Sequence, residues 1–155
     1  MSFRITGLDA KPFRHLYGLS DSELAVHGAM RYVAESKPGY PDRVELRDVE
    51  PGESVLLVNF EHQPVDSPYR SSHAIYVREG ANEPFDKVDH VPESMRTRLL
   101  SLRAFDARGM MLDADVVEGR EIEAVIARLF ADPCVDYIHA HNARRGCYAA
   151  RIDRA

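Results

Sequence analysis

The chain has 155 residues, a formal net charge of −5 and two cysteines, a size that fits one domain spanning residues 1–155. An acidic chain argues against nucleic-acid binding, which needs a basic face, and no apolar run approaches the ~20 residues that cross a membrane. Because no signal peptide precedes the first patterned segment and two cysteines make no disulfide framework, we expect a cytoplasmic protein with reduced thiols.

The first half of the chain is predicted to contain one short helix followed by strands. The helix lies in "LSDSELAVHG", where Ser20 and Glu23 have the spacing of a capping box and Gly28 ends the helix. Alternating or clustered apolar residues between turn signals predict strands at 30–34, 43–47, 54–60 and 73–79. A loop over 62–72, an irregular connection over 84–92 and a short helix in "PESMRTR" complete this half.

The second half is predicted to contain two hairpins separated by the main helix. In "LLSLRAFDARGMMLDADVV", Gly109 supplies the left-handed turn residue, and the register then places Arg103 opposite Asp113. Such an ion pair explains Asp113 and Asp115 better than a metal site does. The main helix, "REIEAVIARLFADP", carries one apolar stripe. This helix and the short N-terminal one, among about eight strands joined by hairpins, predict an α+β fold with a mostly antiparallel sheet.

The last hairpin, "YIHAHNARRGCYAARID", brings two histidines and a cysteine together. With Gly146 as the left-handed residue of its turn, His139 faces Arg151 across the strand pair. The polar face of this hairpin then carries His139, His141, Cys147 and Arg151. The opposite, apolar face carries Ile138, Ala140, Tyr148, Ala150 and Ile152.

Three interpretations of this polar face are open. His-x-His on a strand is a familiar zinc spacing, with Cys147 as a possible third ligand, but Arg151 beside His139 would repel a metal and spacing places no fourth ligand. We therefore expect no metal, and nothing indicates another cofactor. Alternatively, His141 and Arg151 would favour a reactive thiolate, which makes Cys147 and His141 candidate catalytic residues, with Cys134 buried on its strand as an inert counterpart. The third interpretation is a hydrogen-bonded polar face without chemistry.

The loop "HQPVDSPYRSS" is the other candidate site. It is long for a hairpin connection and contains two prolines, and long ordered loops are often functional. Together with the strand after it, the loop carries side chains that could hold a small anion through Arg70, namely His62, Asp66, Tyr69, Arg70 and His73. The alternative is a structural loop in which Arg70 pairs with Asp66 or Glu61.

Three segments resemble one known family: "EHQPVDSPYRSSHAIYVRE", "SLRAFDARGMMLDADVV" and "YIHAHNARRGCYAARID". The family is a bacterial domain of unknown function, number 1203 in that series, and the resemblance runs from "FRITGLD" to the C-terminus. It implies no activity, substrate or catalytic residue. Members often carry a cysteine where this chain has Asp42, so the resemblance does not extend here to a mechanism that pairs such a cysteine with Cys147.

These observations predict a protein that binds a small anionic molecule, at a site formed by the 62–73 loop and the C-terminal hairpin. The hairpin would contribute His139 and Arg151. The alternative function is an enzyme that uses Cys147 and His141 on a small substrate, and a non-catalytic protein-interaction module is the third class. The combined site requires that the polar side chains of the loop meet the polar face of the hairpin in space.

Overall fold

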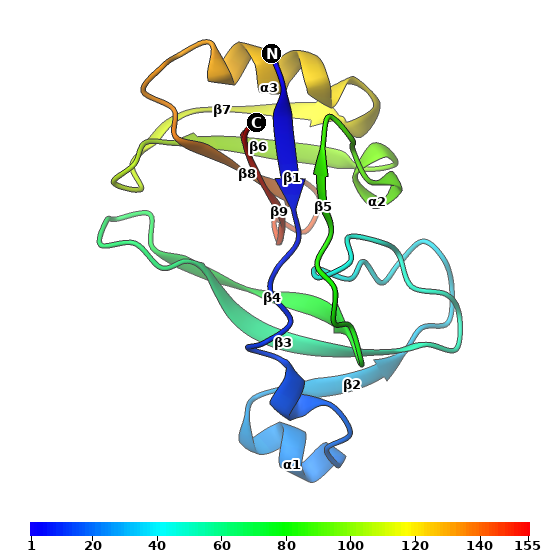
Figure 1. The fold of residues 1–155 in the computed structure, drawn as a ribbon. Helices are drawn as coiled ribbons and strands as arrows, with labels where there is room; N and C mark the ends of the chain where they lie inside the picture. Colours follow the sequence, from blue (N-terminus) through cyan, green and yellow to red (C-terminus); the bar gives the residue numbers. More distant parts are fainter.

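The computed structural model describes all 155 residues and contains nine strands in two antiparallel sheets, which confirms the predicted α+β class (Figure 1). The six-stranded sheet has the order β5-β1-β9-β8-β6-β7. Its strands are β1 Phe3–Thr6, β5 Asp86–Val88, β6 Leu99–Phe105, β7 Met111–Glu118, β8 Tyr137–Asn142 and β9 Tyr148–Arg154. The three-stranded sheet has the order β2-β3-β4, with β2 Met30–Val33, β3 Ser54–Gln63 and β4 Ser71–Arg78.

The helices are short, and none is long and apolar enough to span a membrane. They are α1 Asp21–Val26, α2 Glu93–Arg96 and α3 Ile122–Phe130, with 3-10 turns at Arg14–Leu16 and Gly119–Glu121. The capping box of α1 forms as predicted, because the Ser20 hydroxyl accepts from the Glu23 N–H while the Glu23 carboxylate accepts from the Ser20 N–H. Gly28 follows the helix with a φ of 68°.

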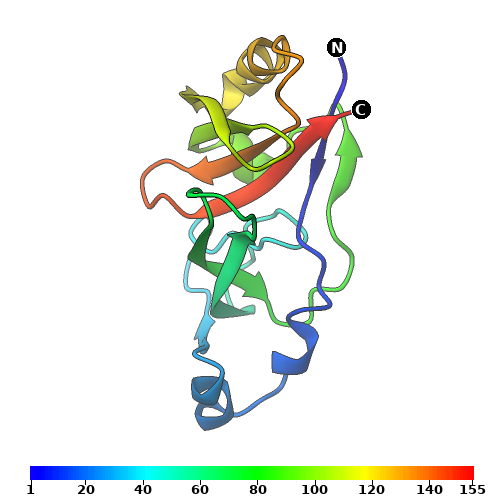
Figure 2. The ribbon, with the colours of Figure 1, turned by 90° about the vertical axis from the view of Figure 1, so that its left-hand side faces the viewer.

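The helix α3 covers one face of the six-stranded sheet, and the three-stranded sheet lies beyond the other face (Figures 1 and 2). The predicted stripe of α3 provides the contact, since Ile122, Ile126, Leu129 and Phe130 are all buried. They pack on the residues of β6, β8 and β9 that face them, namely Leu100, Leu102, Ile138, Ala140 and Ile152. Burying each large aliphatic side chain contributes roughly 1.5–3 kcal/mol. This apolar layer determines which face of β8 is left for polar residues.

A second apolar cluster lies on the three-stranded sheet. Leu56 and Val58 of β3 and Ile75 and Val77 of β4 pack against the segment between β1 and β2. That segment contributes Phe13, Leu16 and Leu24. The two clusters sit on different sheets, and the polar face of β8 lies in the layer between them.

The predicted strand at 43–47 is wrong. This segment is a turn closed by an isolated bridge between Pro41 and Asp48, and Leu46 adopts a left-handed φ of 52°. The alternating pattern that predicted a strand arises because the turn buries Val44 and Leu46. The turn buries Arg43 as well.

Strand boundaries near the predicted loops also differ from prediction. The strand β3 runs to Gln63 and β4 begins at Ser71, so the loop spans 64–70 instead of 62–72. The connection over 84–92 is not wholly irregular, because β5 lies inside it and pairs with β1. Both strands are short, only β5 lies at an edge of the sheet, and they gain order from pairing with distant segments that no local pattern reveals.

A bulge makes the predicted register of the β6–β7 hairpin wrong. The register shifts between Ala104 and Phe105, and Arg103 therefore lies opposite Ala114 instead of Asp113. Asp113 and Asp115 instead form ion pairs with Arg128 of α3, at 3.1 and 2.8 Å.

The C-terminal hairpin follows the predicted register only in part. The pairs Ile138–Ile152, His139–Arg151 and Ala140–Ala150 form as predicted. A bulge then places Tyr148, and not Ala149, opposite His141. The ring of Tyr148 consequently lies on the histidine face and not on the apolar face predicted for it.

Candidate functional site

Four histidines from the two sheets meet in the layer between them. His62 and His73 belong to β3 and β4, and His139 and His141 belong to β8. The ring centroid of His62 lies 4.7 Å from that of His73 and 5.0 Å from that of His141, and the His73 and His141 centroids are 5.2 Å apart. We call these four residues the histidine cluster. Part of the predicted loop site thus meets the polar face of the hairpin.

The apolar residues of the strands explain this convergence. Ile138 and Ala140 point toward α3, so the alternation of a strand directs His139 and His141 to the opposite face. In β4, His73 lies two positions before Ile75 and shares its face, opposite Phe60 of β3. His73 therefore continues the face of β4 that packs in the second apolar cluster, whereas His139 and His141 lie on the face of β8 opposite its apolar residues.

Burial keeps the histidine cluster neutral at pH 7. Desolvation, supported by the charges of neighbouring groups such as Arg103, lowers the pKa of His62 to about 4 and the pKa values of His139 and His141 to about 3. Tyr148 closes one side, with its ring stacked on His62 at a centroid distance of 5.0 Å. Burial raises the pKa of the Tyr148 phenol, so this group is also neutral.

Each histidine of the cluster has one buried ring nitrogen without a hydrogen-bond partner: Nδ1 of His62, His73 and His139, and Nε2 of His141. Ligand atoms of His62, His139 and His141 lie within 4.8 Å of one another, so these three residues could hold a metal ion. The prediction of no metal relied partly on the lack of further ligands at a suitable spacing in the sequence. His62 and His73 come from a different sheet, which spacing along the chain does not reveal.

The other predicted loop residues do not join the histidine cluster. The Arg70 side chain is 62% exposed, and its guanidinium donates to the Glu61 carboxylate at 3.0 and 3.2 Å. This is the pairing expected of a structural arginine. Tyr69 is exposed with its ring 6.2 Å from that of Phe105, and Asp66 is exposed as well.

The remaining predicted residues of the hairpin separate from one another. Arg151 pairs with Asp153 at 2.9 Å, and its guanidinium carbon lies 4.2 Å from the centroid of the Tyr137 ring. The Cys147 thiol accepts from Arg43, whereas His141 Nδ1 contacts the carbonyl oxygen of Gly146. No hydrogen bond joins Cys147 to His141. Cys134 is exposed in the turn after α3, so its predicted position on the core side of a strand is wrong.

A cleft of about 700 Å³ lies at the turn of the C-terminal hairpin, on the side to which Cys147 points. Segments 36–43, 97–99 and 142–147 contribute most of its walls. Its lining includes four arginines, Arg43, Arg98, Arg144 and Arg145, but only one carboxylate, that of Glu118. We call it the arginine cleft.

The four arginines of the arginine cleft differ in their partners. The buried Arg43 donates to the Tyr148 carbonyl at 2.7 Å and to Cys147 Sγ at 3.1 Å, and burial lowers its pKa. Arg98 is held by the Asp48 carboxylate at 2.6 and 2.8 Å. The other two, Arg144 and Arg145, are exposed and form no ion pair. Of the four, the sequence draws attention only to Arg144 and Arg145, because they stand as a pair of arginines before Gly146 in the turn.

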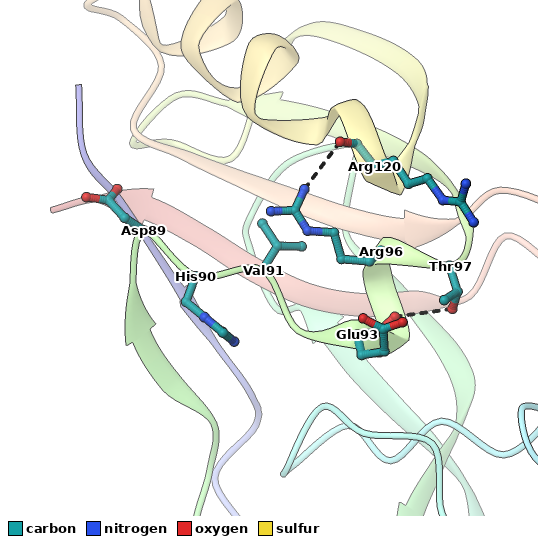
Figure 3. A pocket seen from close by; sticks show the side chains of 7 residues that line it. All are labelled: Asp89, His90, Val91, Glu93, Arg96, Thr97 and Arg120. Carbon is teal, nitrogen blue, oxygen red and sulfur yellow. Dashed lines mark hydrogen bonds between the residues drawn. The ribbon is translucent and has the colours of Figure 1, made fainter.

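A second hollow, of about 460 Å³, lies between the β5–α2 connection and the residues that precede α3 (Figure 3). Its charged lining residues are two acids, Asp89 and Glu93, and two arginines, Arg96 and Arg120. Arg96 is already bound to the Glu123 carboxylate and to the carbonyl of Arg120. Because its charges balance, this hollow has no preference for an anion.

The comparisons with known proteins identify a family. The sequence profile described as "Protein of unknown function (DUF1203)" matches residues 39–154, so the chain belongs to this family, as the resemblance of the three segments predicted. Searches of curated proteins and of solved structures return no match. The family description gives no activity, and the function has to be inferred from the site.

Proposed function

We propose that this protein binds a small anionic molecule in the arginine cleft. The observation that carries the proposal is the presence of four arginines and a single carboxylate around one cleft, in a chain with a net charge of −5. The proposal keeps the ligand class expected from the sequence and the involvement of the C-terminal hairpin. It replaces the 64–70 loop by residues 36–43 as the second wall of the site.

The charge balance of the arginine cleft favours an anion even after the existing ion pair is discounted. Asp48 neutralises Arg98, which leaves Arg43, Arg144 and Arg145 against Glu118. A unit charge 4 Å from an opposite charge near a protein surface gains ~4 kcal/mol before desolvation is subtracted. The two exposed arginines can turn toward a ligand without breaking an ion pair.

The walls of the arginine cleft suggest the kind of anion. Its volume lies within the roughly 300–1,000 Å³ that small-molecule sites occupy. Tyr40 and Tyr76 form an aromatic wall, with ring centroids 5.4 Å apart, and Asn142 adds a neutral polar group. A guanidinium recognises carboxylates and phosphates through paired hydrogen bonds. We therefore propose a carboxylate or phosphate attached to a planar or apolar group.

The role we propose is binding, because the thiol of Cys147 and the ring of His141 contact different partners and do not form a nucleophile–base pair. A cytoplasmic location is part of the proposal, since both cysteines are free and that compartment keeps thiols reduced. The alkylation rate of Cys147 can report whether a ligand occupies the arginine cleft, because this residue lines it.

The test is a thermal-shift screen of small phosphates and carboxylates, combined with alkylation of the two cysteines. We expect at least one anion to raise the melting temperature, by an amount equivalent to ~2.7 kcal/mol at a hundredfold excess over Kd. The same anion should slow alkylation of Cys147 and leave the exposed Cys134 unaffected. An Arg144→Gln/Arg145→Gln variant should lose both effects.

The matched control is Arg108→Gln, at the turn of the β6–β7 hairpin, where the arginine is also exposed. This variant and Arg70→Lys should respond to the anion as the wild type does. If no anion stabilises the wild type, or if the double variant responds equally, the arginine cleft is not an anion site.

A further inference from the structure

The histidine cluster is a second site, separate from the arginine cleft, and we propose that it binds a divalent transition metal of the zinc class. The ligands are His62, His139 and His141, and the fourth position is taken by a small anion beside Arg103. The proposal does not depend on ligand binding in the arginine cleft.

The three ligand atoms are close to the geometry that the metal requires. Zinc takes imidazole nitrogens at 2.0–2.1 Å in a tetrahedron, so its ligand atoms lie about 3.4 Å from one another. The ligand atoms of His62, His139 and His141 already lie within 4.8 Å of one another. Each ring therefore has to move inward by about 1 Å or less, which side-chain rotation can supply.

In two of the histidines, a hydrogen bond to one ring nitrogen leaves the other ring nitrogen free to bind a metal. His141 Nδ1 lies 2.9 Å from the Gly146 carbonyl oxygen, which can only accept, so Nδ1 carries the proton and Nε2 keeps a free lone pair. His62 Nε2 lies 3.3 Å from the Ser71 hydroxyl and leaves Nδ1 free. Metal-binding histidines in proteins usually hold their second nitrogen in this way.

Packing alone does not account for the histidine cluster. A buried polar atom without a hydrogen bond destabilises the folded state, and four such nitrogens face one small region here. The rings are neutral, which is the form that coordinates a metal. A metal ion would give three of the four nitrogens a partner.

His73 is excluded from the ligand set by the orientation of its ring. The rings of His73 and His62 are stacked, with an angle of 7° between their planes and 4.7 Å between their centroids. The lone pair of an imidazole lies in the plane of the ring, so two parallel stacked rings do not aim at one ion. His73 is also less buried than the other three and lies at the more open side of the histidine cluster.

Arg103 identifies the fourth ligand as an anion. It lies opposite His139 in the β6–β8 pair, has no carboxylate partner, and makes one long hydrogen bond, at 3.4 Å, to the Ser101 hydroxyl. Three neutral imidazoles leave both charges of a divalent ion unbalanced, and Arg103 adds a third. A hydroxide or small anion on the metal would offset this charge and give the guanidinium an acceptor. Arg151 contributes less repulsion, because Asp153 pairs with it.

The experiment uses tag-free protein from which metals have been stripped with a chelator. It is titrated with Co²⁺, whose visible absorption is strong when the ion is tetrahedral, and then with Zn²⁺ as competitor. We expect one Co²⁺ per chain with a tetrahedral spectrum, displaced by Zn²⁺. The variants His62→Gln and His139→Gln should bind at least tenfold more weakly, because loss of a mere supporting residue already costs roughly 10–100-fold.

The matched control is His27→Gln. His15 and His27 are exposed with ring centroids 5.3 Å apart, so they form the pair most able to bind metal adventitiously. Ser71→Ala removes the hydroxyl that contacts His62 and, with it, a hydrogen bond to the Tyr69 carbonyl oxygen, but it keeps every ligand. It should weaken binding less than His62→Gln does, and it keeps the test valid if a ligand variant does not fold. Azide should change the Co²⁺ spectrum of the wild type but not that of Arg103→Gln.

Three results would overturn the proposal. They are the absence of a tetrahedral Co²⁺ spectrum, binding that is lost in His27→Gln but kept in the cluster variants, and equal binding by wild type, His62→Gln and His139→Gln. An unchanged azide response in Arg103→Gln would overturn the assignment of the fourth ligand.

Discussion

The turn of the β6–β7 hairpin should not tolerate a side chain at Gly109, because the 64–70 loop is packed on it. Gly109 has a left-handed φ of 80°, and a Cβ atom added there would lie 2.7–2.8 Å from three side-chain carbons of Val65. The Ser67 hydroxyl also donates to the Gly109 carbonyl at 3.0 Å. The loop of the three-stranded sheet is thus attached to a turn of the six-stranded sheet.

The expected loss of stability in Gly109→Ala has two parts. The left-handed conformation costs a residue with a Cβ ~1–2 kcal/mol. A carbon–carbon contact of 2.7 Å is far inside the optimum of roughly 3.5–4.0 Å, so Val65 must shift, and overpacking of this kind costs about 1–3 kcal/mol. We expect a total decrease of ~2–5 kcal/mol in the free energy of unfolding.

Gly146→Ala is the matched control that measures the cost of the left-handed conformation without any steric clash. Gly146 has nearly the same φ, 77°, but no atom lies within 4 Å of an added Cβ. We expect a decrease of only ~1–2 kcal/mol. Urea unfolding followed by circular dichroism measures both values, since an unchanged slope with a lower midpoint reports stability directly. Equal losses in the two variants would refute the packing of Val65 on Gly109.

Three further predictions concern ion pairs and capping. Asp48→Asn should lower the free energy of unfolding by about 3 kcal/mol, because it removes the partner of the mostly buried Arg98; a loss under about 1 kcal/mol, as for a surface pair, would contradict this. The hydrogen bond from Arg47 lowers the pKa of Glu53 to about 2, so this carboxylate stabilises the fold above about pH 4.5, and the effect disappears as the pH falls toward 2. A titration by NMR should show the Glu53 pKa rising in Arg47→Gln, and an unchanged value would argue against the pair. Ser20→Ala should lower stability by about 1 kcal/mol through loss of the cap, and a neutral effect would show that α1 does not depend on it.

The parts of the fold that the sequence predicts well depend on residues close together in the chain. The capping box of α1 involves positions three apart, and the apolar stripe of α3 repeats every three to four residues. The turns at Gly109 and Gly146 require a left-handed residue, and both have one. In contrast, β1 and β5 form through pairing with segments far away in sequence, and neither has a local pattern strong enough to predict it.

The register of both hairpins could not be predicted beyond the bulges. A bulge adds one residue to one strand, and a shift of one residue moves every later side chain to the other face. This is why Arg103 does not meet Asp113 and why Tyr148 lies on the histidine face. No residue type in either hairpin distinguishes a bulged strand from a regular one.

The bulge at Ala149 in β9 also determines how the side chains of the hairpin are divided between two sites. Before the bulge, strict alternation sends His139 and His141 to the layer between the sheets, as predicted. In a regular hairpin Cys147 would share that face. Instead, Tyr148 covers the histidines while Arg43 holds the thiol of Cys147 at the arginine cleft. Residues that the spacing assigns to one reactive centre are therefore divided between a neutral, buried cluster and an open cationic cleft, and the chemistry expected of each site is different.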